Sequence, residues 1–176
     1  MKFNELETLP RIKGEDCLDT AALKALLPNT PDDVIEQFYS DHGLNPDFQE
    51  QYQGLDTSLL KWELVQLSAS ELISASVYDE FQQYFQTCTD KSRRVGTSEN
   101  WHLLHNLECV YSYWEENKTW VRPPVLLKSG TLNDQQHLHL IEGHSRLGAL
   151  KGLVLGKTLQ ECTSHSVWLG GYESAA

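Results

Sequence analysis

Five consecutive residues, Glu142 to Arg146, combine side chains and a backbone turn suited to binding a phosphate group. Gly143 lets the backbone turn sharply and lets a ligand approach without a Cβ in the way. Arg146 can donate two parallel hydrogen bonds to phosphate oxygens, and His144 and Ser145 can add hydrogen bonds from the same turn. Glu142 carries a carboxylate that can hold Mg²⁺ or accept a proton. Glu142 and His144 are therefore the candidate catalytic residues, and Gly143, His144, Ser145 and Arg146 are the candidate ligand-binding residues.

Each of these residues also has a purely structural explanation. Gly143 can serve a tight turn alone, Ser145 can cap a helix, and Glu142 can be a solvated acid near a helix start. Arg146 can pair with a carboxylate of this chain instead of a ligand. Because every residue alone is open to such an alternative, the phosphate hypothesis depends on their spacing taken together.

The elements around the turn are expected to be a strand and a helix. Residues 137–142 alternate in polarity as a strand does, and the leucines within 145–155 recur at helical spacing. A helix start leaves about four backbone N–H groups unpaired and carries roughly half a positive charge, which favours an anion there. The segment HSVWLG (165–170) is expected to form another strand of the same sheet. The sequence therefore predicts a phosphate site at a strand–turn–helix junction.

Capping signals predict three short helices in the first sixty residues. Asp19 precedes one helix, Thr30 with Pro31 begins a second, and Asn45 with Pro46 begins a third. This segment is therefore expected to be mainly helical.

The middle of the chain predicts a strand, helices and loops. Residues 61–67 alternate as a strand, and Ser68 with Glu71 forms a capping box for a short helix that follows. A stripe of aromatic residues predicts a further helix, which is expected to give way to an exposed loop over 87–98. A long helix is expected from Glu99 to Asn117. The two prolines of VRPPVLL suit an entering strand, and TLNDQQ (131–136) is typical of a turn.

Two histidine pairs and one basic cluster are secondary candidates. His137 with His139, and His102 with His105, have spacings that can chelate a transition metal, but no third ligand with motif spacing accompanies either pair. The sequence therefore predicts no metal site of this kind. Lys91, Arg93 and Arg94 form a basic cluster that can touch a phosphate backbone or lie in a solvated loop.

Composition indicates one ordinary domain, or one domain with a helical extension. The chain has 176 residues, of which 40% are hydrophobic and 22% charged, close to globular averages. No apolar run reaches the roughly 18 residues of a membrane helix, and the N-terminus lacks the apolar region of a signal peptide. The four cysteines are widely spaced, which favours reduced thiols. We expect a cytoplasmic protein without a membrane partner.

The net charge of −11 disfavours binding to bulk nucleic acid. Residues 1–60 hold 12 acidic and 4 basic side chains, whereas residues 120–176 hold 4 and 5. The segment with the candidate site is therefore nearly neutral. A small phosphate-containing ligand remains compatible with the charge, because a local site can be positive on a negative protein.

The segment IEGHSRLGALKGLVLGKTLQECTSHSVWLG resembles the ParB/sulfiredoxin-like superfamily. In that pattern an apolar strand leads to G-x-x-R, a helix of the type RLxAL and another apolar strand. RPPVLL is similar to the family's preceding strand, and KWELVQLSASELI to its opening strand and short helix. The resemblance is good over about 120–170, weaker over 60–75 and absent over 1–55.

The resemblance implies an α+β fold in which a small mixed sheet is combined with helices. We expect the ParB/sulfiredoxin-like domain to occupy 59–176, with a helical insertion at about 76–118. A mainly helical N-terminal extension is expected over 1–58.

ParB-like members with the G-H-x-R form bind nucleotides as free-standing domains, and they include ADP-dependent serine kinases. The resemblance therefore implies that Gly143, His144, Ser145 and Arg146 cradle the phosphates of a nucleotide (ATP, ADP or CTP), with or without Mg²⁺. Glu142 would then handle the metal or a proton. Phosphoryl transfer or nucleotide hydrolysis would be the accompanying activity.

Departures from the family pattern keep other functions open. Sulfiredoxins carry a reactive cysteine between the glycine and the histidine, whereas His144 directly follows Gly143 here. The basic G-E-R-R box of chromosome-partition ParB proteins is also missing. One alternative is a ParB-like nuclease, which the acidic charge disfavours. The other is a non-catalytic interaction or regulatory module, such as a defence-system component with a protein partner.

Overall fold

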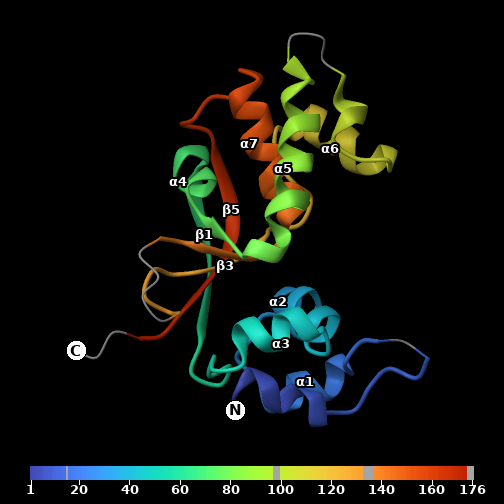
Figure 1. The fold of residues 1–176 in the computed structure, drawn as a ribbon, viewed down its shortest axis with the longest axis vertical. Coiled ribbons are helices and arrows are strands. Elements are labelled where there is room, and N and C mark those ends of the chain that lie inside the picture. The colour runs from blue at the N-terminus through green and yellow to red at the C-terminus, as the bar shows by residue number, and fades with distance from the viewer. Residues whose placement is uncertain (15, 97–99, 133–136, 174–176) are drawn as a thin grey trace.

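The central element of the molecule is a mixed β-sheet, seen in a computed structural model that describes residues 1–14, 16–96, 100–132 and 137–173. Within these ranges the sheet has five strands in the order β1-β5-β3-β4-β2 (Figure 1). The strands are β1 (Lys61–Ser68), β2 (Ser76–Val77), β3 (Val125–Leu127), β4 (His139–Glu142) and β5 (Ser164–Gly171).

The strand pairing mixes both directions. β1 and β5 pair antiparallel along their whole length, and β3 pairs antiparallel with β4. β3 and β5 run parallel, as do β2 and β4. With its helices this sheet makes an α+β fold, which confirms the expected fold class. The strands expected at 61–67, 137–142 and 165–170 are present, but β4 starts only at His139 and residues 133–136 of the expected turn lie outside the described residues.

The helices fall into an N-terminal group and a group between and after the strands. The N-terminal group is η1 (Phe3–Thr8), α1 (Thr20–Leu26), α2 (Asp32–Val34), a π-helical turn η2 (Ile35–Ser40) and α3 (Pro46–Tyr52). The second group is α4 (Ala69–Ile73), α5 (Asp79–Arg93), η4 (Trp101–Leu103), α6 (Glu108–Asn117) and α7 (His144–Leu155).

Three of the four capping signals of the sequence are confirmed, whereas at α2 Pro31 and not Thr30 is the N-cap residue and no side chain caps the helix. Asp19 caps α1 by accepting a hydrogen bond from Ala22 N (2.8 Å), and Asn45 Oδ1 caps α3. Ser68 and Glu71 form the expected capping box of α4. Side-chain oxygens at these starts satisfy N–H groups that have no partner within the helix.

Two helix predictions are wrong in the middle of the chain. Residues 87–93 of the expected loop over 87–98 belong to α5, which continues to Arg93, and residues 97–99 lie outside the described residues. The expected helix from 99 to 117 is divided: η4 is a single turn, and α6 starts at Glu108. At the break His105 Nδ1 accepts a hydrogen bond from Leu107 N (3.0 Å), so a side chain replaces the helical partner of that N–H group.

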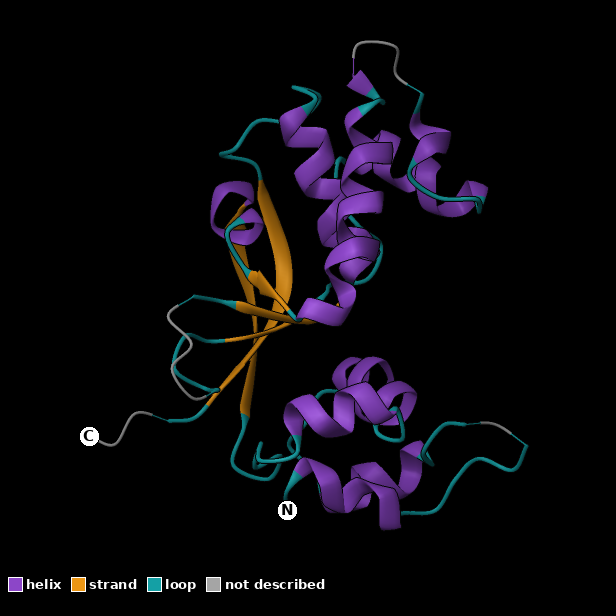
Figure 2. Ribbon diagram, viewed as in Figure 1, coloured by secondary structure: helices purple, strands orange, loops and turns teal. Residues whose placement is uncertain are grey.

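The two faces of the sheet bury two different cores (Figure 2). On one face Leu126 and Leu140 pack with the apolar residues of α4, α5 and α7. On the other face Val125, Leu127 and Ile141 pack with the N-terminal helices. The side chains alternate because successive strand residues point to opposite faces. The N-terminal helices therefore cover the part of this face that carries Val125, Leu127 and Ile141, whereas Leu64 of β1 stays exposed.

α5 and α7 pack unusually closely because glycines line their contact. Gly148, Gly152 and Gly156 recur on one face of α7, and each lies against the backbone of α5. A Cβ at Gly152 would lie 2.6 Å from the Ser92 Cβ and 2.7 Å from Arg93 N. This contact holds α7, and therefore the turn at its start, in a fixed place.

Candidate functional site

The junction of β4 and α7 requires glycine at position 143. Gly143 has a φ of 103°, and a Cβ there would lie 2.5 Å from the Pro124 Cβ. Both the backbone conformation and the nearby proline therefore exclude an ordinary side chain. No side chain caps the start of α7, so the turn leads directly into a twelve-residue helix with N–H groups at its start. The predicted strand–turn–helix junction is confirmed.

Arg146 points inward and pairs with a carboxylate of this chain, which is the structural explanation that the sequence left open. Its Nη1 donates to Gln37 Oε1 (2.7 Å) and to the carbonyl of Arg122 (2.9 Å). Its Nη2 donates to Glu142 Oε1 (3.1 Å), and only 19% of the side chain is exposed. The guanidinium therefore joins the N-terminal helices to α7 and to the segment before β3.

Glu142 has both carboxylate oxygens engaged. Oε1 accepts from Arg146, and Oε2 lies 3.0 Å from His42 Nε2. Burial raises the pKa of this carboxyl, but the hydrogen bond and charge of His42 and the charge of Arg146 outweigh burial and hold the pKa below its usual value. Glu142 is thus an ionised member of a closed network.

The network continues through Arg122 to side chains of α2 and η2. Arg122 forms ion pairs with Asp33 and Glu36, and Asp33 Oδ2 accepts from Trp168 Nε1 (2.8 Å). We call the set Asp33, Gln37, His42, Arg122, Glu142 and Arg146 the polar bridge. It spans residues more than one hundred positions apart in sequence.

His144 occupies a different environment from Arg146. Its ring centroid lies 4.6 Å from that of Phe81, and 7% of the residue is exposed. Its Nε2 has no hydrogen-bond partner among the described residues. Burial lowers the pKa of His144 to about 4, so the imidazole is neutral at neutral pH. His144 and Arg146, which the sequence suggested would act on the same ligand, therefore lie in different environments.

A cavity of about 220 Å³ adjoins the first turns of α7 on the Ser145 and Arg146 side. Its walls come from α6 and the residues just before it, from the segment before β3 and from α7. The apolar wall consists of Leu104, Val110, Trp114, Trp120, Val121 and Ala149, and the polar end consists of His105, Arg122, Ser145 and Arg146. The cavity thus combines aromatic surface with two arginines, a combination that suits an anion with an apolar part.

The cavity was not visible in the sequence pattern. Trp114 and Trp120 are buried and packed edge to face with centroids 5.8 Å apart. Trp120 Nε1 also donates to Ser166 O (2.8 Å), which fixes the ring in the wall. The positions come from separate elements, so no local spacing indicated that they would meet Ser145.

No family model, curated protein or solved structure matches this chain. The ParB/sulfiredoxin-like resemblance therefore stays a prediction, and the site is interpreted from its own geometry.

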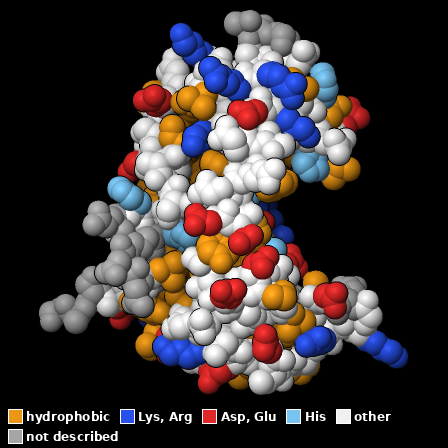
Figure 3. All heavy atoms as spheres, viewed as in Figure 1, with side chains coloured by type: hydrophobic (Ala, Val, Ile, Leu, Met, Phe, Trp, Pro, Cys, Tyr) orange, Lys and Arg blue, Asp and Glu red, His pale blue; other side chains and the backbone are white. Residues whose placement is uncertain are grey.

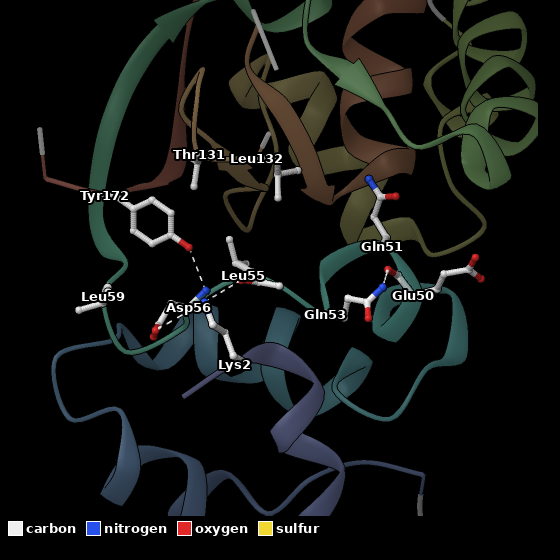
Figure 4. Close-up of a pocket in the computed structure, with 11 residues that line it drawn as sticks. Lys2, Glu50, Gln51, Gln53, Leu55, Asp56, Leu59, Thr131, Leu132 and Tyr172 are labelled. Atoms are coloured by element: carbon white, nitrogen blue, oxygen red, sulfur yellow. Dashed lines mark hydrogen bonds and ion pairs between the residues drawn. The ribbon is translucent and has the colours of Figure 1, made fainter. Parts of the chain in front are cut away.

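A larger depression of about 620 Å³ lies near the other end of the sheet (Figure 4). It is lined by residues around the end of α3 together with Lys2, Asp56, Thr131, Leu132 and Tyr172. The Tyr172 hydroxyl accepts from Asp56 N (2.8 Å), and the Asp56 carboxylate pairs with the N-terminal amino group (3.2 Å). None of the residues that line this depression belongs to the junction of β4 and α7, so we take the cavity beside α7 as the candidate site.

The described residues contain neither a candidate metal site nor a helix that could span a membrane. No group of three or more His, Cys, Asp or Glu side chains there is arranged to hold a metal ion. None of the helices in those ranges has the length and apolar character needed to cross a bilayer.

Proposed function

We propose that this protein binds a small phosphate-containing ligand, with nucleotides as the first candidates, in the cavity beside the first turn of α7. The observation that carries the proposal is the lining itself, in which two tryptophans face a polar end made by Arg122, Ser145 and Arg146. The uncapped start of α7 adds partial positive charge at that end. The resemblance of the 142–153 segment to nucleotide-binding ParB-like domains points the same way.

The size of the cavity limits what it can enclose. Ligand pockets for whole drug-sized molecules measure about 300–1,000 Å³, whereas this cavity measures about 220 Å³. It therefore encloses one part of a nucleotide, with the remainder in solvent. Arg122 is the more accessible of the two arginines, with 39% of its side chain exposed compared with 19% for Arg146, and a phosphate there would compete with Glu36 for its guanidinium.

Binding is better supported than catalysis. A phosphoryl-transfer site needs a carboxylate that is free to hold Mg²⁺ or to accept a proton, but both Glu142 oxygens are already paired. His144 is turned toward Phe81 and is not among the cavity-lining residues. Mg²⁺, if required, would therefore arrive with the nucleotide and would not be held by Glu142.

Isothermal titration calorimetry tests the proposal with ATP, ADP, CTP, GTP and inorganic phosphate, each with and without Mg²⁺. Val121 is 59% exposed at the cavity wall, so Val121→Glu adds a repelling charge with little risk to folding. We expect at least one nucleotide to bind and Val121→Glu to weaken binding by about tenfold or more. Leu26→Glu is the matched control, because Leu26 is 51% exposed outside the cavity lining.

A non-catalytic interaction module is the second candidate. The closed polar bridge favours it, because Arg146 and Glu142 then serve to fasten the N-terminal helices and need no ligand. Absence of binding to all five compounds would favour this candidate. An unchanged affinity in Val121→Glu would contradict the cavity as the ligand site.

A further inference from the structure

Five basic side chains lie in, or just after, the C-terminal halves of α5 and α7. Close contacts join Phe85 to Gly148, Thr89 to Gly152 and Arg93 to Gly156, so the two helices run parallel and end together. We call this set the basic end: Lys91, Arg93, Arg94 and Lys157 lie at the shared end, and Lys151 lies farther back, beside Phe85. Figure 3 shows Lys and Arg side chains gathered over the upper helices, whereas mainly acidic side chains appear over the lower part.

The basic end is accessible, and its side chains are not held in ion pairs by the carboxylates that the structure describes. Lys91, Arg93, Arg94 and Lys157 are exposed, and Lys151 is half-buried with its Nζ 5.3 Å from the centroid of the Phe85 ring. Within the described residues none of the five forms an ion pair. By contrast, Arg122 and Arg146 are both paired in the polar bridge.

The negative ends of the two helix dipoles offset only part of the positive charge of the basic end. Each helix C-terminus carries roughly half a negative charge, so the two ends together need about one cation. Asp90, which precedes Lys91 and is hydrogen-bonded to Gln86 (2.9 Å), offsets about one more. The basic end therefore retains a local excess of positive charge on a chain whose net charge is −11.

We propose that the basic end is a docking surface for a short acidic segment of a partner protein. Along α7 the four steps from Lys151 to the helix end at Leu155 span about 6 Å, and Lys157 follows two residues later. An extended segment of about three residues covers that length. At physiological salt, charges beyond roughly 8 Å are screened, so a short segment is attracted locally while the distant acidic surface has little effect.

Duplex nucleic acid fits this surface less well than a short acidic segment. A duplex carries charge along its whole length and would extend past the basic end over the acidic remainder of the molecule. The docking surface is also separate from the cavity beside α7, because none of its five residues lines that cavity. The inference therefore stands independently of the proposed ligand.

Fluorescence anisotropy with a labelled hexaglutamate peptide tests the docking surface. The charge-reversal variant combines Arg93→Glu, Arg94→Glu and Lys157→Glu. The matched control combines Arg11→Glu, Lys13→Glu and Lys61→Glu, which changes the net charge equally at exposed positions elsewhere. A hexaglutamine peptide and a short DNA duplex are measured in parallel, and thermal unfolding verifies that each variant is folded.

We expect salt-sensitive binding of hexaglutamate that weakens by about tenfold or more in the charge-reversal variant and by less than about threefold in the control. If charge reversal impairs folding, the same three positions are changed to Gln, which should weaken binding in the same direction. Lack of peptide binding, equal weakening in both variants, or tighter binding of duplex than of peptide would each overturn the proposal.

Discussion

At the scale of single residues, Arg146 is expected to be a stabilising residue. Arg146→Ala leaves Glu142, Gln37 and the Arg122 carbonyl without their donor. Removing one partner of a buried network of this kind costs about 2–4 kcal/mol. Urea unfolding should show that loss, and Arg146→Lys should recover part of it because an ammonium cannot reproduce the planar fork. Arg94→Ala, at an exposed position, serves as the control, and an equal loss there would contradict this role for Arg146.

Buried histidines make the stability of the protein sensitive to acid. Burial lowers the pKa of His139, His144 and His165 to about 4 from a usual value of 6.5. The folded state therefore favours the neutral rings, so their contribution is complete above pH 6.5 and is lost as the pH falls toward 4.

At pH 5 each of these histidines should reduce the free energy of unfolding by roughly 1–2 kcal/mol relative to pH 7.5. His144→Phe removes one titrating ring while keeping an aromatic side chain beside Phe81, so its stability should fall less over the same interval. Unfolding measured at both pH values checks this. An equal fall in the variant and the natural chain would exclude His144 as a contributor.

At the scale of elements, the contact between α5 and α7 depends on glycine. Gly152→Ala places a Cβ within 2.6 Å of the Ser92 Cβ. The clash should outweigh the gain of about 1 kcal/mol in helix propensity and lower the free energy of unfolding by about 1–3 kcal/mol. Gly54→Ala is the control, since a Cβ there meets no atom within 4 Å. A stabilised Gly152→Ala would show that the helices can separate without cost.

The same contact explains which elements the sequence could predict. Local signals were sufficient for capped helices and for strands with alternating polarity. They failed at the end of α5, where Thr89 and Ser92 look like loop residues but are buried against the glycines of α7. Their hydroxyls accordingly donate to helix carbonyls, Thr89 to Phe85 O and Ser92 to Cys88 O. A tertiary contact decided the structure there, and no window of sequence contains it.

The candidate site shows the same limit. Gly143 and the strand–turn–helix junction followed from local sequence. The partners of Arg146 did not, because Gln37 and Arg122 are 109 and 24 residues away in the chain. The cavity wall likewise combines α6 with the segment before β3.

At the scale of the whole molecule, the N-terminal helices should be required for folding. They cover the sheet face that carries Val125, Leu127 and Ile141, all of which are fully buried. A fragment of residues 59–176 would expose that face and lose half of the polar bridge. We expect it to lack a cooperative thermal transition and to bind a hydrophobic dye. A sharp transition in the fragment would instead show that 59–176 folds alone.

The central claim, ligand binding in the cavity beside α7, is tested most directly by the indole N–H signals of the five tryptophans in a nitrogen-15 NMR titration with ATP, ADP or CTP. Trp114 and Trp120 line the cavity, whereas Trp62 and Trp101 do not and serve as internal controls. Trp168 is not a control, because its Nε1 donates to Asp33, the ion-pair partner of Arg122. We predict that nucleotide shifts the signals of Trp114 and Trp120 in a saturable way and leaves those of Trp62 and Trp101 nearly unchanged. Unchanged signals at both cavity tryptophans, or shifts confined to Trp62 and Trp101, would contradict the account.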